Sequence, residues 1–159
     1  MYDVTFYFAH HYLEKGDRTI DQMVQAARSG KQNIAEGAAA GNTSKETEIK
    51  LTNVAKASLQ ELLVDYEDFL RVRGLEQWKA DDARLAQTKR ACATHNDSEY
   101  YRKAMPERSA ETIANIAITL IHQTDWLLNK LIEKLEIQFV ENGGVKEQMT
   151  KARKEYRGY

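Results

Sequence analysis

Proline and glycine, the two residues that most often interrupt helices, are scarce in this chain. Its 159 residues include one proline, Pro106, and eight glycines. Long stretches without either residue favour extended helices and disfavour a turn-rich β fold. After Pro106, apolar residues recur three or four positions apart from Ile113 to Leu135, and a glycine pair ends the pattern. We therefore predict an all-α fold in which residues 106–142 form a central helix.

Turn and capping signals divide the rest of the chain. Gly16 follows an aromatic-rich segment, and residues 19–22 and 43–46 each have the form of a capping box, in which two side chains satisfy free backbone donors at the start of a helix. Glycines at positions 41 and 74 mark helix ends. The helices predicted from these signals cover residues 2–15, 19–41 and 43–73, with a peripheral helix over 75–94 and a short helical piece over 99–105.

The predicted helix over residues 43–73 is apolar on two sides. One apolar stripe runs from Leu51 to Phe69, and the second consists of Leu59, Leu63 and Leu70. About 30 residues at 1.5 Å per residue give a length of roughly 45 Å, which exceeds what a compact monomer of this size needs. We therefore expect another copy of the chain to cover part of the second stripe, so that the protein is a homo-oligomer.

Residues 28–37 place polar side chains in the middle of a predicted helix. Three of them follow at intervals of four and share a face, and Gly30 in mid-helix indicates that a neighbouring backbone comes close. Two interpretations stay open. The favoured one is a packed polar segment at an interface between helices or subunits, made of Arg28, Gln32, Asn33, Glu36 and Gly37. The alternative is a small-ligand or enzymatic site that uses Arg28, Asn33 and Glu36.

Metal and nucleophile chemistry have little basis in the sequence. A helical bundle can hold two metal ions when its helices carry inward carboxylates and Glu-x-x-His pairs, and this chain has no such pair. We expect Cys92 to be an ordinary, partly buried thiol. We expect Trp78 and Trp126 to be packing anchors. We accordingly expect no catalytic residue, metal or cofactor.

The charge is nearly balanced overall but uneven along the chain. The formal net charge is −1, so any binding to nucleic acid must be local. Residues 145–159 form a basic arm after a main domain over 1–144, which includes a helical insertion at about 75–105. For this arm a merely soluble, frayed tail is the favoured interpretation, and a local patch that binds nucleic acid is the alternative. The candidate nucleic-acid contacts are Arg71, Arg73, Lys146, Lys151, Arg153, Lys154 and Arg157.

The sequence also bears on the compartment. A lone cysteine cannot form an internal disulfide, no charged-then-apolar leader stands at the N-terminus, and no apolar run approaches the ~20 residues that cross a bilayer. We expect a soluble, cytoplasmic protein without membrane contact.

Short motifs between residues 18 and 73 resemble a known family. They are Arg28-Ser29, the Asn-Ile-Ala-Glu-Gly run at 33–37, Ser-Lys-Glu at 44–46 and Ala-Ser-Leu-Gln-Glu-Leu at 57–62. These motifs are similar to those of bacterial four-helix-bundle proteins encoded within intervening sequences of 23S ribosomal RNA, also labelled S23 ribosomal protein. The 106–142 segment resembles the family in pattern only. The basic arm resembles the suffix region of a longer subgroup.

The resemblance implies a left-handed, up-down-up-down four-helix bundle that assembles as a ring, a pentamer. A related accessory protein of diversity-generating retroelements forms such a ring and binds a reverse transcriptase and nucleic acid. The expected function is therefore a non-enzymatic, oligomeric helical-bundle protein that serves as an RNA-associated accessory or scaffold factor. The alternatives are a ligand-binding or enzymatic bundle and a purely structural adaptor between proteins.

Overall fold

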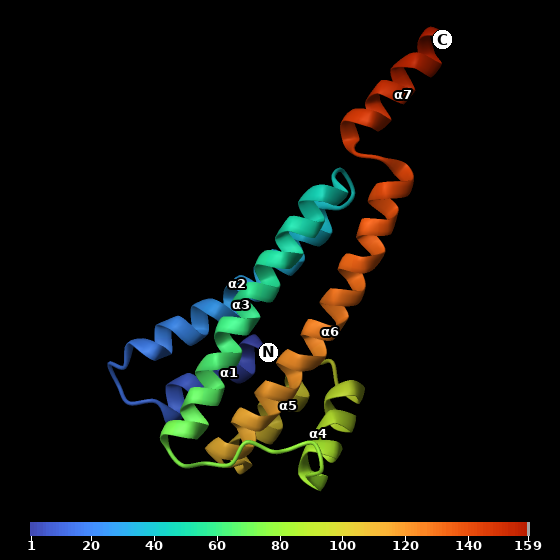
Figure 1. Cartoon of the computed structure of the whole chain (residues 1–159). Coiled ribbons are helices and arrows are strands. Elements are labelled where there is room, and N and C mark those ends of the chain that lie inside the picture. Colours follow the sequence, from blue (N-terminus) through green and yellow to red (C-terminus); the bar gives the residue numbers. More distant parts are fainter. Residues whose placement is uncertain (159) are drawn as a thin grey trace.

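The computed structural model describes residues 1–158, and these are helical nearly throughout, with no strand among them (Figure 1). This confirms the predicted all-α class. The helices are α1 (Tyr2–Tyr12), α2 (Arg18–Ala40), α3 (Lys45–Val72), α4 (Ala83–Thr94), α5 (Ser98–Ala104), a 3-10 turn (Met105–Glu107), α6 (Ala110–Asn142) and α7 (Val145–Arg157). Within the described part of the chain, no helix is both long enough and apolar enough to cross a membrane.

Helices α2 and α3 form a long hairpin that turns at residues 41–44 (Figure 1). Small residues on α2 let the two helices approach. A Cβ atom added at Gly30 would lie 3.2 Å from Leu59 Cδ2 and 3.8 Å from the backbone oxygen of Ala55. The close approach predicted from this mid-helix glycine is therefore confirmed, and α3 is the neighbour.

The core lies where α1 and the first half of α6 pack against this hairpin. The rings of Phe8 and Tyr66 are 4.9 Å apart, and the Tyr66 hydroxyl donates a hydrogen bond of 3.0 Å to Thr5 Oγ1. Phe8, Tyr66 and Thr5 are fully buried, and Ile113 and Ile121 of α6 are fully buried as well. An aromatic helix therefore anchors the N-terminal end of the chain to α3, as large buried rings do elsewhere.

The second apolar stripe of α3 is already buried within the single chain. Leu59, Leu63 and Leu70 are 3%, 7% and 1% exposed within the single chain. The sequence argument for an oligomer was therefore wrong at this point, because α2 and α6 both pack against α3 and share its wide apolar arc. The surface of α3 that stays exposed is a third one, which includes Val54, Val64 and Val72.

Several predicted helix starts are displaced. The cap of α2 is Asp17, whose side chain accepts a 2.8 Å hydrogen bond from the Thr19 backbone N–H, so Thr19 is not the cap. Ser44 caps α3 in the same way through Thr47. The helix predicted over 75–94 begins only at Ala83, and the chain before it runs over α6 without helical structure. The side chain of Asp82 provides the α4 cap.

The C-terminal arm is a separate helix. Gly143 ends α6 with φ 71° and ψ 173°, a backbone region that essentially only glycine adopts. Beyond it α7 extends past the end of the α2–α3 hairpin (Figure 1), and none of its residues is buried. The glycine pair predicted to stop the long helix does so, and the arm that follows is ordered as a helix.

Candidate functional site

The polar side chains of the 28–37 segment lie at the surface of the single chain. Arg28, Gln32 and Glu36 are exposed. The half-buried Asn33 donates only to Ser29 of its own helix, at 2.9 Å to the carbonyl oxygen and 3.2 Å to the hydroxyl. Gly37 is buried against α3. One face of the segment therefore packs on α3, whereas its charged and amide side chains are not packed inside one copy, and its role as an interface or a ligand site stays a prediction.

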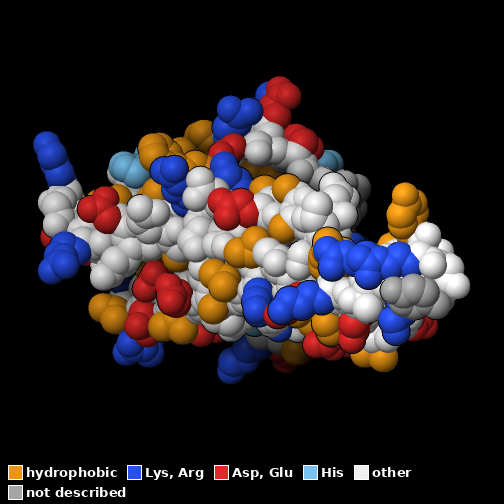
Figure 2. Space-filling model, turned by 90° about the horizontal axis from the view of Figure 1, so that it is seen from above, with side chains coloured by type: hydrophobic (Ala, Val, Ile, Leu, Met, Phe, Trp, Pro, Cys, Tyr) orange, Lys and Arg blue, Asp and Glu red, His pale blue; other side chains and the backbone are white. Residues whose placement is uncertain are grey.

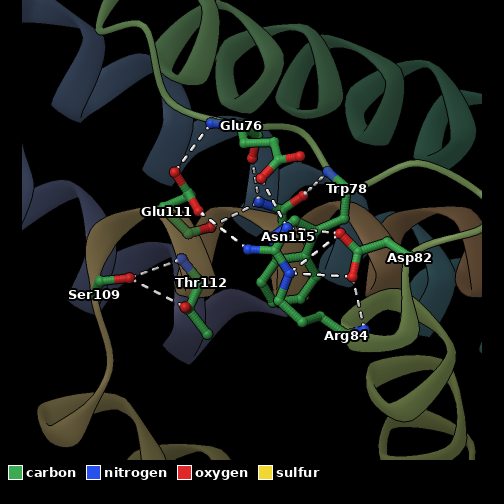
Figure 3. Close-up of polar contacts among 8 residues, drawn as sticks. All are labelled: Glu76, Trp78, Asp82, Arg84, Ser109, Glu111, Thr112 and Asn115. Carbon is green, nitrogen blue, oxygen red and sulfur yellow. Dashed lines mark hydrogen bonds and ion pairs between the residues drawn. The ribbon is translucent and has the colours of Figure 1, made fainter.

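A buried polar cluster lies elsewhere, between α6 and the segment before α4 (Figure 3). Its centre is Asn115, which is only 2% exposed. The Asn115 amide donates to the backbone oxygens of Glu76 and Glu111 at 2.8 and 2.9 Å, and its Oδ1 accepts from the Trp78 backbone N–H at 2.8 Å. One side chain thus satisfies three backbone groups, and it holds the non-helical segment against α6.

Arg84 closes the outside of this cluster (Figure 3). Its guanidinium pairs with Asp82 at 2.6 Å and with Glu76 at 2.7 Å, and it lies 5.1 Å from the centre of the Trp78 ring. The hydrogen bonds from Arg84 lower the pKa of Asp82 and raise that of Arg84 itself, because each charge stabilises the other. The arrangement orients Trp78, whose side chain is buried.

Two cavities meet at Trp78. The smaller, of about 240 Å³, reaches toward α1 and α5, and the larger, of about 760 Å³, lies between α4 and α6. A hydrogen bond of 3.0 Å from Gln123 to the Lys89 carbonyl joins the two helices beside the larger cavity. The indole N–H of Trp78 has no hydrogen-bond partner among residues 1–158. The larger cavity has the size of a small-molecule pocket.

The two predicted packing anchors differ. Trp78 is buried, as predicted, but Trp126 is 60% exposed at the edge of the larger cavity, so the prediction was wrong for Trp126. Cys92 lines both cavities, and burial raises the pKa of its thiol. A protonated, buried thiol is a poor nucleophile, as expected from the sequence.

The predicted basic contacts do not form one patch. Arg71 and Arg73 stand at the C-terminal end of α3, far from α7 (Figure 1). Arg71 is paired with Asp68 at 2.8 Å, and the Arg73 guanidinium covers the Phe69 ring at 4.0 Å. The other five cations all belong to α7, are exposed, and make the α7 end of the molecule basic (Figure 2). These five are Lys146, Lys151, Arg153, Lys154 and Arg157.

Sequence reasoning missed the Asn115 cluster, although one signal was present. Asn115 is a polar residue within an otherwise apolar stretch of the longest helix, at 113–118. Such a residue must find partners when it is buried. Across residues 1–158, no three His, Cys, Asp or Glu side chains are grouped so that they could hold a metal ion.

Comparisons of the chain with protein-family models, with curated proteins and with solved structures found no match. The family resemblance therefore rests on the short motifs at 28–29, 33–37, 44–46 and 57–62 alone.

Proposed function

We propose that this protein is a helical scaffold that binds RNA through α7. The observation that carries the proposal is the presentation of this helix: it extends from the body, it is exposed over its whole length, and it holds five Lys or Arg against two Glu. Cations held on a projecting helix can reach phosphates without displacing any other part of the protein.

The distribution of charge supports this choice of surface. Residues 145–157 carry a net charge of +3, so the remaining chain carries −4 within the total of −1. The body therefore repels a polyanion, and α7 is the part that attracts one. Binding should be sensitive to salt, because it depends on the displacement of counterions from the phosphates.

The resemblance to proteins encoded within ribosomal RNA intervening sequences points the same way. In this proposal the four helices that build the core, α1, α2, α3 and α6, form a bundle, copies of the bundle associate as a ring, and α7 contacts RNA. The protein then acts by holding RNA and its partners together and needs no catalytic group.

The test is fluorescence anisotropy with a labelled single-stranded RNA over a range of salt concentrations. Replacing Lys151 and Lys154 by glutamine should weaken binding and reduce the slope of log affinity against log salt by about 1.4, at ~0.7 per lost phosphate contact. The matched control replaces Lys130 and Lys134, which are exposed on α6, and should leave the slope unchanged. Equal slopes for both double variants would reject α7 as the RNA-binding element.

A further inference from the structure

The helix α7 has an apolar face that no other residue among 1–158 covers. Val145, Met149, Ala152 and Tyr156 follow at intervals of four, three and four, so they form one stripe along the helix. Met149 is 51% exposed and Tyr156 is 93% exposed. Contacts to RNA phosphates account for the cations of α7, but they do not account for the apolar side chains of Val145 and Met149.

Charge is unequal on the two sides of this stripe. At 100° per residue, Lys146, Arg153 and Arg157 lie together along one edge of the stripe, whereas Lys151 and Lys154 lie toward the opposite side of the helix. The face that combines the apolar stripe with its basic edge is typical of a helix that pairs with an apolar and acidic surface.

The body of the protein presents such a surface on α3. Its exposed face repeats with the same spacing of three and four residues as α7. This face consists of the exposed residues Val54, Ala57, Glu61, Val64, Asp68 and Val72 and of the half-buried Asp65.

The carboxylates of this face are only partly neutralised by cations. Partial burial and the negative charges of Asp68 and Glu61 raise the pKa of the Asp65 carboxyl. Arg71 pairs with Asp68, but none of the ion pairs among residues 1–158 includes Glu61 or Asp65. A cationic helix laid along α3 would lower the repulsion among these carboxylates.

We propose that α7 of one copy docks along the exposed face of α3 in a second copy, so that the protein associates by exchanging its C-terminal helix. The apolar stripe of α7 covers Val64 and Val72, and its basic edge lies beside Glu61, Asp65 and Asp68. The acidic body and the basic arm are then the two complementary halves of one contact.

The partner must be a second copy because α7 cannot reach the acidic residues of its own α3. Its first residues lie beside the α2–α3 turn, where residues 41–46 and 143–148 line one cavity. From Lys45 to Asp68 the helix α3 rises about 35 Å, whereas the 13 residues of α7 span about 20 Å. An α7 that folded back on its own chain would end before Asp65.

The docked helix leaves RNA binding possible. Lys151 and Lys154 lie on the side of α7 away from the stripe, so they stay open to solvent when the stripe is covered. Lys151 and Lys154 therefore stay available to RNA while the stripe and its basic edge are used for self-association, and variants can separate the two.

The test is a charge exchange between two full-length variants, followed by sedimentation velocity at low salt after nuclease treatment. One variant is Glu61→Lys with Asp68→Lys, and the other is Arg153→Glu with Arg157→Glu. We expect the unaltered protein to sediment as a species of about twice the 18.2 kDa chain mass or more. Each variant alone should be a monomer, and an equal mixture of the two should associate again.

Controls separate folding from docking. Both variants change exposed side chains, and their helical circular dichroism should match that of the unaltered protein. Met149→Gln should weaken association without a change in charge, whereas Lys151→Gln with Lys154→Gln should not alter it. The inference is overturned if the unaltered protein is monomeric, if nuclease abolishes the association, or if Glu61→Lys with Asp68→Lys leaves it unchanged. Failure of the mixture to associate would also overturn it.

Discussion

At the scale of single residues, Asn115 connects the non-helical segment before α4 to the longest helix, α6. Its side chain makes three hydrogen bonds, and two of them reach the segment before α4. A hydrophobic residue of the same size could fill the space but would leave the backbone N–H of Trp78 and the backbone carbonyl of Glu76 without these partners. Leaving a buried backbone donor or acceptor without a hydrogen-bond partner costs folding free energy.

Asn115→Ala should therefore lower the free energy of unfolding by about 2–3 kcal/mol, as expected when several buried hydrogen bonds are lost together. The measurement is urea denaturation followed by circular dichroism. Asn53→Ala is the control, because the exposed Asn53 amide bonds only to the Ile49 carbonyl of its own helix, and it should change stability by less than about 0.5 kcal/mol. A similar loss in both variants would contradict the role assigned to Asn115.

Cys92 and Trp126 show how burial decides the behaviour of a side chain. Cys92 lies in the wall between two cavities, and its raised pKa keeps the thiol protonated. Trp126, only a short way along α6 from buried isoleucines, faces outward because it lies on the opposite side of the helix. The type of residue predicts neither outcome without the position of its neighbours.

At the scale of helices, capping side chains define where several elements begin. Asp17, Ser44, Asp82, Asp97 and Ser109 each accept a hydrogen bond from a backbone N–H in the first turn that follows. The backbone N–H of Thr19 lowers the pKa of Asp17 by stabilising its ionised form.

This lowered pKa predicts a dependence of stability on pH. A carboxyl whose pKa falls on folding stabilises the native state above its ordinary pKa of 3.8, and this contribution disappears as the pH falls through the lower folded value. Asp17→Asn keeps an N-cap acceptor but cannot ionise. The difference in unfolding free energy between the parent and Asp17→Asn should therefore shrink between about pH 6 and about pH 3 in urea titrations. A difference that stays constant with pH would show that the Asp17 charge contributes nothing.

At the scale of the whole molecule, the chain consists of a packed body and an arm that takes no part in the core. Among residues 1–158, every buried residue precedes Gly143, and the arm begins after the glycine that breaks α6. The same division appears in the charges, because the body is acidic and the arm is basic. A molecule with this polarity favours contact between the arm of one copy and the body of another.

Removal of residues 145–159 should leave the folded body intact. In dilute solution, where association is negligible, we expect the midpoint of thermal unfolding to change by less than about 2 °C, since no core contact is lost. Differential scanning fluorimetry of the chain ended at Gly144 makes the measurement. A substantially lower midpoint would mean that α7 packs on its own body, which would contradict the exposed arm.

The sequence by itself determined the helical class, the C-terminal ends of most helices and the division between body and arm. These depend on local chemistry: the spacing of apolar residues, the scarcity of proline and the glycine at the end of α6 all act within a few turns of helix. The resemblance added a ring of four-helix bundles, which stays part of the proposed function.

The tertiary structure decided which faces of these helices are covered. Periodicity shows that Leu59 and Leu63 lie on an apolar face, but both α2 and the distant α6 are needed to bury that face within one copy. The hydrogen bonds of Asn115 likewise depend on tertiary structure, because its partners Glu76 and Trp78 stand some 35 to 40 positions earlier in the chain. Contacts between distant segments depend on how the helices cross, and no local pattern encodes that geometry.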